Sequence, residues 1–519
     1  MEITMNKFKE KAKAFFDKEG AKLSGTGFFA LTLALIIVLN IFLFVLVEAF
    51  GWYIYEDKGE DLSLSGNTDS MFEEAKNEGK KIKITFCLDR DSLEKHETGS
   101  FVHQTALNFL ERYPTLVELE YVNIMTRRDS KNRLVENFND RYLKDMRGNE
   151  TYVRKTSVMF ECGDNWRILT DPYTSAGFSD FFTLDSSNYI SSYNGEEVMA
   201  AMMAWVLRDE HKTAYFTQYH GEEVDIAFSN LLVCAGYYID VVDLKNEDIP
   251  ADASMLVISN PKTDFEMRYE GSGIVTEIES EIERMRNYLS AGGNLYVTLD
   301  PYVKELSVLE SFIAEYGIKF STTEYENGRV ARNIVKDTQN AITLDGFTLV
   351  SEFSESELAK KISDKIKQYG DGGVIMREVS ALELSGSAKP LLVSSSSSVL
   401  SADGKTVNSD GAYTLAAYSE TALENGAFAK LFVIPSVYLA VSDTLISREY
   451  SNKDFLYSLF GEYFGGGIVP LGCRAVLYNN ETLENLTMRN ARIYTALIMI
   501  IPVAVAITGA VVLTKRKNR

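Results

Sequence analysis

Two uninterrupted apolar stretches stand near the two ends of this 519-residue chain. Residues 23–47 carry no charge over about 25 positions, and residues 493–514 none over about 22. At 1.5 Å per residue the first stretch would extend roughly 37 Å, against about 30 Å for the hydrocarbon core of a bilayer. A cleaved signal peptide fits the first stretch poorly, because the apolar run is too long and no small-residue cleavage site follows. The pattern predicts two transmembrane helices, at 23–50 and 493–514.

Basic residues flank both predicted spans. Segment 1–22 holds six lysines and four acids, and the tail 515–519 adds four basic residues. Short flanks rich in lysine and arginine stay in the cytoplasm. We therefore expect a plasma-membrane protein with both termini cytoplasmic and a large extracytoplasmic body. With a total charge of −21 and +6 at the two ends, the body carries −27. This acidity argues against nucleic acid and anionic lipid as partners. The simplest explanation of the acidity itself is a solvated, like-charged surface without a specific binding role.

After a polar connector at 51–80, the pattern of apolar positions changes between that of strands and that of helices. A period of two, rich in β-branched and aromatic residues, predicts strands, and apolar residues three and four apart predict helices. Residues 81–190 therefore form a small α/β domain, which resembles a thioredoxin-like fold without its redox cysteines. The expected elements are strand 81–88, helix 100–113, strand 116–124 and a hairpin of 157–162 with 165–171 about Gly163-Asp164.

Strands and helices alternate regularly in the next region, 191–470. This alternation predicts a mostly parallel, Rossmann- or flavodoxin-like sheet with helices on both faces. From about 340 the signal weakens, and the serine run 394–398 reads as a loop. A connector, 471–492, leads to the second span. The expected elements are helices 193–210, 224–235, 274–290, 303–316 and 452–466, and strands 213–218, 238–242, 254–259, 294–299 and one within 429–447.

Polar residues follow three of the predicted parallel strands. Ligands of open parallel sheets bind outside the carboxyl ends of the strands. If these strands are neighbours, one cleft would hold an imidazole, a lysine and several carboxylates, a candidate contact site for a ligand or partner. The candidate residues are Tyr219, His220, Gly221, Glu222, Asn260, Lys262 and Asp300.

Each of these residues also has a purely structural explanation. Gly221 permits a tight turn, and Glu222 and Glu223 suit the positive end of the following helix. Asn260-Pro261 and Asp300-Pro301 are ordinary turn dipeptides. The structural explanation is the simpler one, and a contact site is the alternative.

Motifs that would carry catalysis are missing from the sequence. There is no G-x-S-x-G elbow, no Walker-type phosphate loop and no set of ligands with metal-binding spacing. The cysteines are scattered without a C-x-x-C pair, and Cys87 and Cys234 lie in apolar runs typical of a core. We therefore expect a protein that is not an enzyme and that binds neither cofactor nor metal.

The order of several phrases along the chain is characteristic. They are "YNGEEVMAAMM", "AYFTQYHGEE", "SMLVISNPKTDF" followed by "YLSAGGNLYVTLDP", and "NKDFLYSLFGEYF" before the last span. Over nearly its whole length the chain resembles the gliding-motility-associated (GldG-like) auxiliary subunits of ABC transporters. Two positions depart from that pattern: Pro435-Ser436-Val437-Tyr438 replaces Gly-Asp-Ser-Asp, and Tyr219 replaces the glycine before His-Gly-Glu.

The resemblance implies a membrane-anchored auxiliary subunit that works with a separate ABC permease and an ATP-binding subunit. Its extracytoplasmic domain would contact an external ligand or a component of the cell envelope. Two alternatives stay open: a membrane-anchored hydrolase or amidotransferase-like enzyme using His220 and Glu222, and an envelope sensor or scaffold without a transport role.

Overall fold

The computed structural model describes residues 62–126, 128–129, 146–147, 153–170, 178–184, 190–265, 280–337, 339–370, 373–408, 410–447, 450–467 and 469–477. Both predicted membrane spans, 23–50 and 493–514, and their basic flanks lie outside these residues. None of the helices in the described part of the chain is long and apolar enough to cross a membrane. Asp61–Tyr478 form one compact unit of mixed α/β structure.

The first region contains a five-stranded sheet in the order β3-β2-β1-β4-β5. Strands β1 and β2 are parallel and joined through α5, whereas β4 and β5 form an antiparallel hairpin that turns at Gly163, with φ 60°. The predicted elements of this region are thus confirmed to within a few residues. The bounds are α3 (Asp69–Asn77), β1 (Ile82–Phe86), α4 (Arg90–Glu94), α5 (Gly99–Arg112), β2 (Val117–Asn123), β3 (Arg128–Asp129), β4 (Val158–Cys162) and β5 (Asn165–Leu169).

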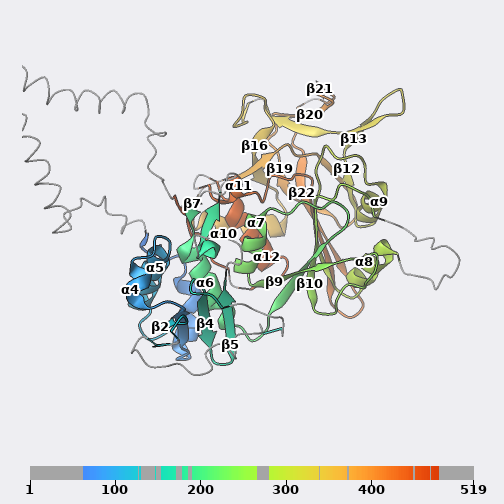
Figure 1. The fold of residues 1–519 in the computed structure, drawn as a ribbon. Coiled ribbons are helices and arrows are strands. Elements are labelled where there is room, and N and C mark those ends of the chain that lie inside the picture. Colours follow the sequence, from blue (N-terminus) through green and yellow to red (C-terminus); the bar gives the residue numbers. More distant parts are fainter. Residues whose placement is uncertain are drawn as a thin grey trace, which may run out of the picture. The chain divides into compact units, whose positions relative to one another are not determined.

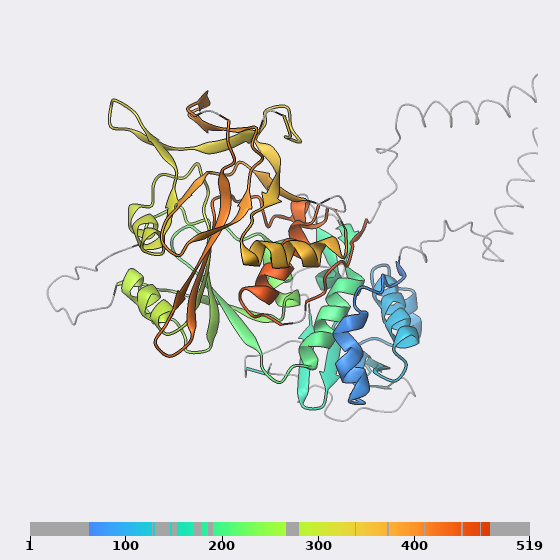
Figure 2. The ribbon, with the colours of Figure 1, turned by 180° about the vertical axis from the view of Figure 1, so that it is seen from behind.

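Helix α5 shows how the apolar spacing sets the packing. Val102, Ala106 and Phe109 lie on one helical face and are fully buried. They belong to the same core as Phe86 of β1 and the residues of α6 (Gly195–Val206), a helix that packs on β4 and β5. Helix α5 contacts α6, and Figure 2 shows the blue helices of this region gathered beside the green α6.

The second region is built on a larger sheet with the order β17-β16-β19-β22-β23-β11-β10-β8-β9, joined by β18 and β12 at β22 (Figure 1). Its core strands alternate with helices, as the sequence predicts. The bounds are β8 (Lys212–Thr217), α7 (Ile226–Cys234), β9 (Tyr237–Val242), β10 (Ala253–Ser259), α8 (Glu281–Ser290), β11 (Asn294–Thr298), α9 (Ser307–Glu315), β12 (Ile318–Phe320), β16 (Thr348–Phe353), α10 (Glu357–Lys367), β17 (Val374–Arg377), β18 (Leu382–Leu384), β19 (Lys389–Val393), β22 (Thr414–Ala422), β23 (Phe428–Ile434) and α12 (Asn452–Glu462).

Only part of this sheet is parallel. The pairs of β9 with β8, β8 with β10, β10 with β11 and β11 with β23 are parallel. From β23 through β22, β19 and β16 to β17 every pair is antiparallel. The expectation of a mostly parallel sheet therefore holds for one half, because tight connections such as Leu423–Ala427 can join only antiparallel neighbours.

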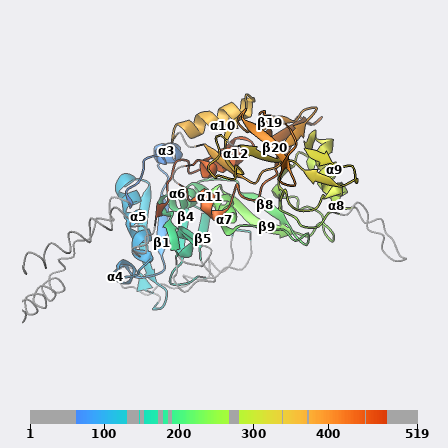
Figure 3. The same ribbon diagram turned by 90° about the horizontal axis from the view of Figure 1, so that it is seen from above.

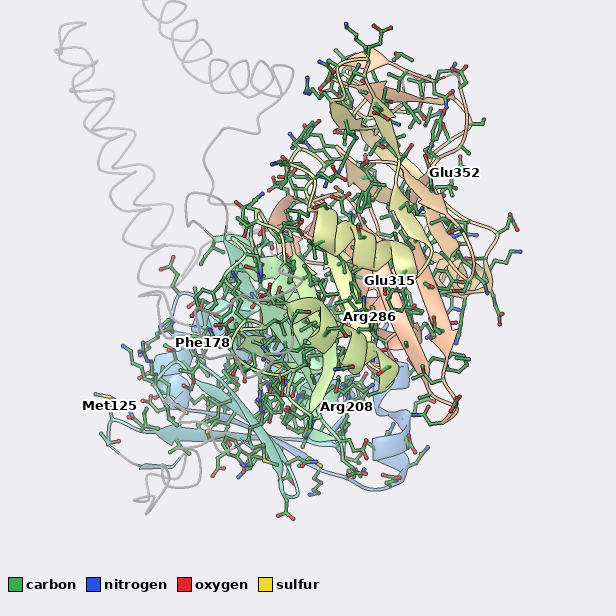
Figure 4. All side chains as sticks on the ribbon, turned by 90° about the vertical axis from the view of Figure 1, so that its right-hand side faces the viewer. Met125, Phe178, Arg208, Arg286, Glu315 and Glu352 are labelled. Carbon is green, nitrogen blue, oxygen red and sulfur yellow. The ribbon has the colours of Figure 1, made fainter. Side chains whose placement is uncertain are left out.

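Helices cover both faces of the parallel half. Alternate strand residues such as Tyr215, Leu256 and Leu295 share a core with α8 and α9, whose Arg286 and Glu315 form an ion pair at 2.7 Å (Figure 4). Residues on the opposite face, including Phe216, pack with α7 and α12. Helix α10 lies beside α12 (Figure 3). Helix α8 begins at Glu281, not at residue 274 as predicted, because Ser280 is its extended N-cap and accepts a hydrogen bond from Glu283 N.

Short elements complete the described part of the chain. The serine run lies mostly in a loop, as predicted: Ser395 and Ser397 both donate hydrogen bonds to the buried Asp337. The remaining elements are a 3-10 turn (Ser179–Phe181), β6 (Phe182–Leu184), β7 (Ile190–Tyr193), β13 (Thr322–Glu324), β14 (Val330–Arg332), β15 (Ile334–Asp337), β20 (Ser398–Ala402), β21 (Lys405–Thr406), α11 (Ser442–Leu445) and β24 (Val476–Leu477).

Candidate functional site

The three strands that precede the candidate residues are neighbours in the sheet. Strand β10 lies between β8 and β11, and all three run parallel. Their carboxyl ends therefore lie at one edge of the sheet, where open α/β proteins bind ligands. Tyr219–Glu222 follow β8, Asn260 and Lys262 follow β10, and Asp300 follows β11. The structure thus brings together all seven residues that the sequence singled out.

Left-handed backbone conformations shape these strand exits. Tyr219 has a φ of 76°, Gly221 of 72° and Asn260 of 50°. Gly221 suits its position, since an added Cβ would lie 3.1 Å from the Cβ of Lys262. Tyr219 is unusual, because residues with bulky side chains rarely adopt this conformation, and its side chain is 67% exposed.

His220 holds the exits of β8 and β10 together. Its carbonyl oxygen accepts hydrogen bonds from Lys262 N at 2.7 Å and from Thr263 N at 2.9 Å. Its own backbone nitrogen donates to Glu222 Oε2 at 2.7 Å. These backbone contacts of His220 hold the two loops together independently of its imidazole.

The imidazole of His220 is fully buried between two carboxylates. Nδ1 lies 3.1 Å from Glu222 Oε1, and Nε2 lies 3.0 Å from Glu281 Oε1 at the start of α8. The second contact is an ion pair without the alignment of a hydrogen bond. The ring of Phe265 stacks on the imidazole at a centroid distance of 3.9 Å. Each edge of the imidazole is therefore occupied by an acid and one face by an aromatic ring.

This environment favours the charged imidazolium. Burial by itself lowers the pKa of His220, but the two carboxylates outweigh it and raise the pKa to about 9. Burial raises the pKa of Glu222, and its hydrogen bonds to His220 reverse the effect, so that this pKa is lowered. A histidine held in the protonated state is a poor general base near neutral pH. The geometry suits an electrostatic link between β8 and α8.

The role that the sequence suggested for Glu222 is wrong. Glu222 bonds to His220 rather than to the N-terminus of the next helix, and α7 begins only at Ile226. The cap of α7 is Asp225, which accepts a hydrogen bond from Ala227 N at 2.8 Å. Glu223 is directed elsewhere too, since Lys262 Nζ lies 3.3 Å from its Oε2.

Lys262 connects the exits of β10 and β11. Its Nζ donates to Asp300 Oδ2 at 3.0 Å, and Asp300 Oδ1 accepts from Tyr302 N at 2.9 Å. Burial lowers the pKa of Lys262, but Asp300 and Glu223 more than compensate and raise it. Unlike His220, the Lys262 side chain remains 31% exposed. This pair forms the solvent-accessible part of the polar edge.

Sequence reasoning missed two members of the site, Glu281 and Phe265. Glu281 was placed in the interior of a longer predicted helix, although Ser280 with Glu283 three residues later is a recognisable helix-start signal. Phe265 carries no sequence signal, because its ring meets His220 only through the tertiary fold.

The segment Pro435-Ser436-Val437-Tyr438, which departs from the family-like pattern, follows β23, the next strand along this edge. Ser436 Oγ donates a hydrogen bond to Arg377 O at 2.7 Å.

Within the described residues, no group of three His, Cys, Asp or Glu side chains is arranged to hold a metal ion. All four cysteines, which are described, carry free thiols, and Cys87 and Cys234 are buried in the core as predicted.

Comparisons with known proteins give distant structural likenesses only. No protein-family model matches the chain, and no curated protein matches it. The mmIFT52 N-terminal domain is similar over 49% of this chain and 99% of its own length, with 15% identity and a TM-score of 0.35. A ThuA-like protein from Bacteroides uniformis covers 48% of this chain and 89% of its own, with 11% identity and a TM-score of 0.29. PurLQS from Thermotoga maritima covers 49% and 99%, with 9% identity and a TM-score of 0.26.

Proposed function

We propose that this chain is a non-catalytic, membrane-anchored auxiliary subunit of an ABC transporter. Its acidic α/β body would lie outside the cytoplasm and bind an external ligand or an envelope partner, while a separate permease and ATP-binding subunit perform transport. The observation that carries the non-catalytic part is the state of His220, whose two nitrogens both face buried carboxylates. The anchored, auxiliary part rests on the two apolar stretches, their basic flanks and the order of family-like phrases.

Within the mixed α/β fold we propose two domains with known architectures. Residues 81–190 supply a βαβ unit and a hairpin in the order β2-β1-β4-β5, with α6 packed on the hairpin strands. This arrangement supports a thioredoxin-like domain. The parallel strands β9, β8, β10, β11 and β23, with helices on both faces, support a Rossmann- or flavodoxin-like domain at 191–470, followed by the connector 471–492.

A cysteine-labelling experiment tests the topology. Glu326 is exposed, so Glu326→Cys in a Cys162→Ser background offers one accessible thiol in the body, since the other three cysteines are buried. In intact cells a membrane-impermeant maleimide should label this position. A cysteine introduced after Arg519 should react only once the membrane is permeabilised. Labelling of position 326 that requires permeabilisation would refute the extracytoplasmic placement.

Co-purification tests the transporter role. The tagged full chain, extracted in detergent, should bring down an ABC permease and its ATP-binding subunit. Repeated recovery of the chain alone would contradict the proposal. His220→Ala and the more conservative His220→Gln separate it from the hydrolase alternative. An enzyme using His220 and Glu222 would lose all function in both variants while the complex still assembles. In our proposal any loss should follow the loss of folded protein.

A further inference from the structure

Two exposed tyrosines flank the polar edge of the sheet. Tyr219 follows β8 and is 67% exposed, and Tyr302 follows β11 and is 62% exposed. Since β10 lies between these strands and neighbouring strands are about 4.8 Å apart, the two exits are separated by roughly 10 Å. Tyr219 also keeps its left-handed backbone, a strain of the kind that gathers at ligand sites. Two aromatic faces are thus presented to solvent at one edge.

Polar groups of both kinds lie between the tyrosines. Lys262 can donate hydrogen bonds, and Asp300 and Glu223 can accept them. The edge therefore offers mixed donors and acceptors beside two aromatic rings.

The charge of this edge narrows the class of ligand. Among the side chains described above, the four carboxylates of Glu222, Glu223, Glu281 and Asp300 outnumber the cations of His220 and Lys262, and this excess of negative charge disfavours anions such as phosphates. The ammonium of Lys262, near the middle of the edge, disfavours cations. Hydroxyl groups both donate and accept hydrogen bonds, and the C–H faces of sugar rings pack on aromatic side chains.

We propose that the carboxyl edge of β8, β10 and β11 binds a neutral carbohydrate. In this site Tyr219 and Tyr302 stack on sugar rings, while Lys262 and Asp300 bond to sugar hydroxyls. The inference deepens the proposed function and rests on it for location, since an extracytoplasmic body meets the glycans of the cell envelope.

Calorimetric titration of the full chain with neutral oligosaccharides tests the site. The probes are tetra-N-acetylchitotetraose, cellotetraose and maltotetraose, and the detergent must carry no sugar headgroup that would compete. At least one probe should bind. Tyr219→Ala and Tyr302→Ala should each weaken its binding about tenfold, whereas Tyr219→Phe and Tyr302→Phe keep the ring and the affinity. Phe428→Ala is the matched control, because this 49% exposed ring begins β23 at the opposite edge of the sheet.

A further variant tests the polar groups separately from the rings. Lys262→Met removes the ammonium donor and keeps both tyrosines, so carbohydrate binding should weaken several-fold. Thermal unfolding of each variant confirms that it is folded.

Several results would overturn the proposal. The first is that no probe binds at about 10 mM, a concentration at which even very weak sites bind. The second is that the alanine variants bind the sugar like the wild type. The third is that the tyrosine variants no longer co-purify with the permease but still bind the sugar. The last result would make this edge a protein interface. Tyrosine-dependent sugar binding by a chain that never co-purifies with a permease would support the site while refuting the transporter role.

Discussion

The charge state of His220 leads to a prediction about stability and pH. In the unfolded chain this imidazole has a pKa near its ordinary value of 6.5, whereas Glu222 and Glu281 raise it to about 9 in the fold. The difference of about 2.5 pKa units, at about 1.36 kcal/mol each, corresponds to about 3 kcal/mol of folding free energy. Removing one partner from a buried ion pair typically costs about 3–5 kcal/mol, which agrees with this value.

The sign of the effect follows from proton binding. Between about pH 6.5 and pH 9 the folded state holds one proton more than the unfolded state at His220, so a rise in pH destabilises the fold. The contribution is complete below about pH 6.5 and is lost as the pH rises through 9. His220→Gln should therefore be about 3 kcal/mol less stable than the wild type at about pH 6, and nearly equal to it at about pH 10.

The measurement is urea unfolding of the full chain in detergent, followed by tryptophan fluorescence at several pH values. His103 supplies a matched control. Like His220 it is buried, with its Nε2 2.7 Å from Tyr121 OH, but this partner is a hydroxyl rather than a carboxylate, and burial lowers the pKa of His103. The contribution of His103 should be present above about pH 6.5 and fade in acid, the opposite direction. A deficit of His220→Gln that stays constant from pH 6 to pH 10 would refute the imidazolium assignment.

Three further predictions concern stability. Lys453→Met should cost about 3 kcal/mol in urea unfolding, because Lys453 Nζ lies 2.5 Å from Glu197 Oε2 in a largely buried pair. Lys360→Met, in the exposed pair with Glu355, should leave the stability nearly unchanged, and equal costs of the two substitutions would contradict this. Asp337→Asn should cost about 2 kcal/mol near neutral pH. Burial raises the pKa of Asp337, but hydrogen bonds, chiefly from Ser395, outweigh it and lower the pKa from 3.8 to about 2. The cost should therefore vanish in unfolding curves as the pH falls through about 2. Tyr219→Asn should raise stability by about 1 kcal/mol in thermal unfolding, because asparagine tolerates the left-handed backbone better, and a loss of stability would argue against strain there.

The sequence by itself determined the local elements and the neighbourhood of the site. Helix α5 could be predicted because its apolar residues recur with helical spacing. Strands β8, β10 and β11 could be predicted because short apolar runs between turn residues are typical of strands buried on both faces. The seven candidate residues could be found because a polar residue directly after a buried strand marks the carboxyl end of that strand. Their convergence followed once the strands proved to be neighbours.

Only the tertiary structure decided which distant segments meet. Strand β23 pairs with β11 although a long stretch of chain separates them, and it is there that the sheet changes from parallel to antiparallel. Likewise, Glu281 and Phe265 reach His220 from other elements. Apolar periodicity shows that a face must be covered but not by what, because many buried strands and helices could satisfy the same pattern. The choice among them depends on side-chain packing and charge pairing across the whole fold.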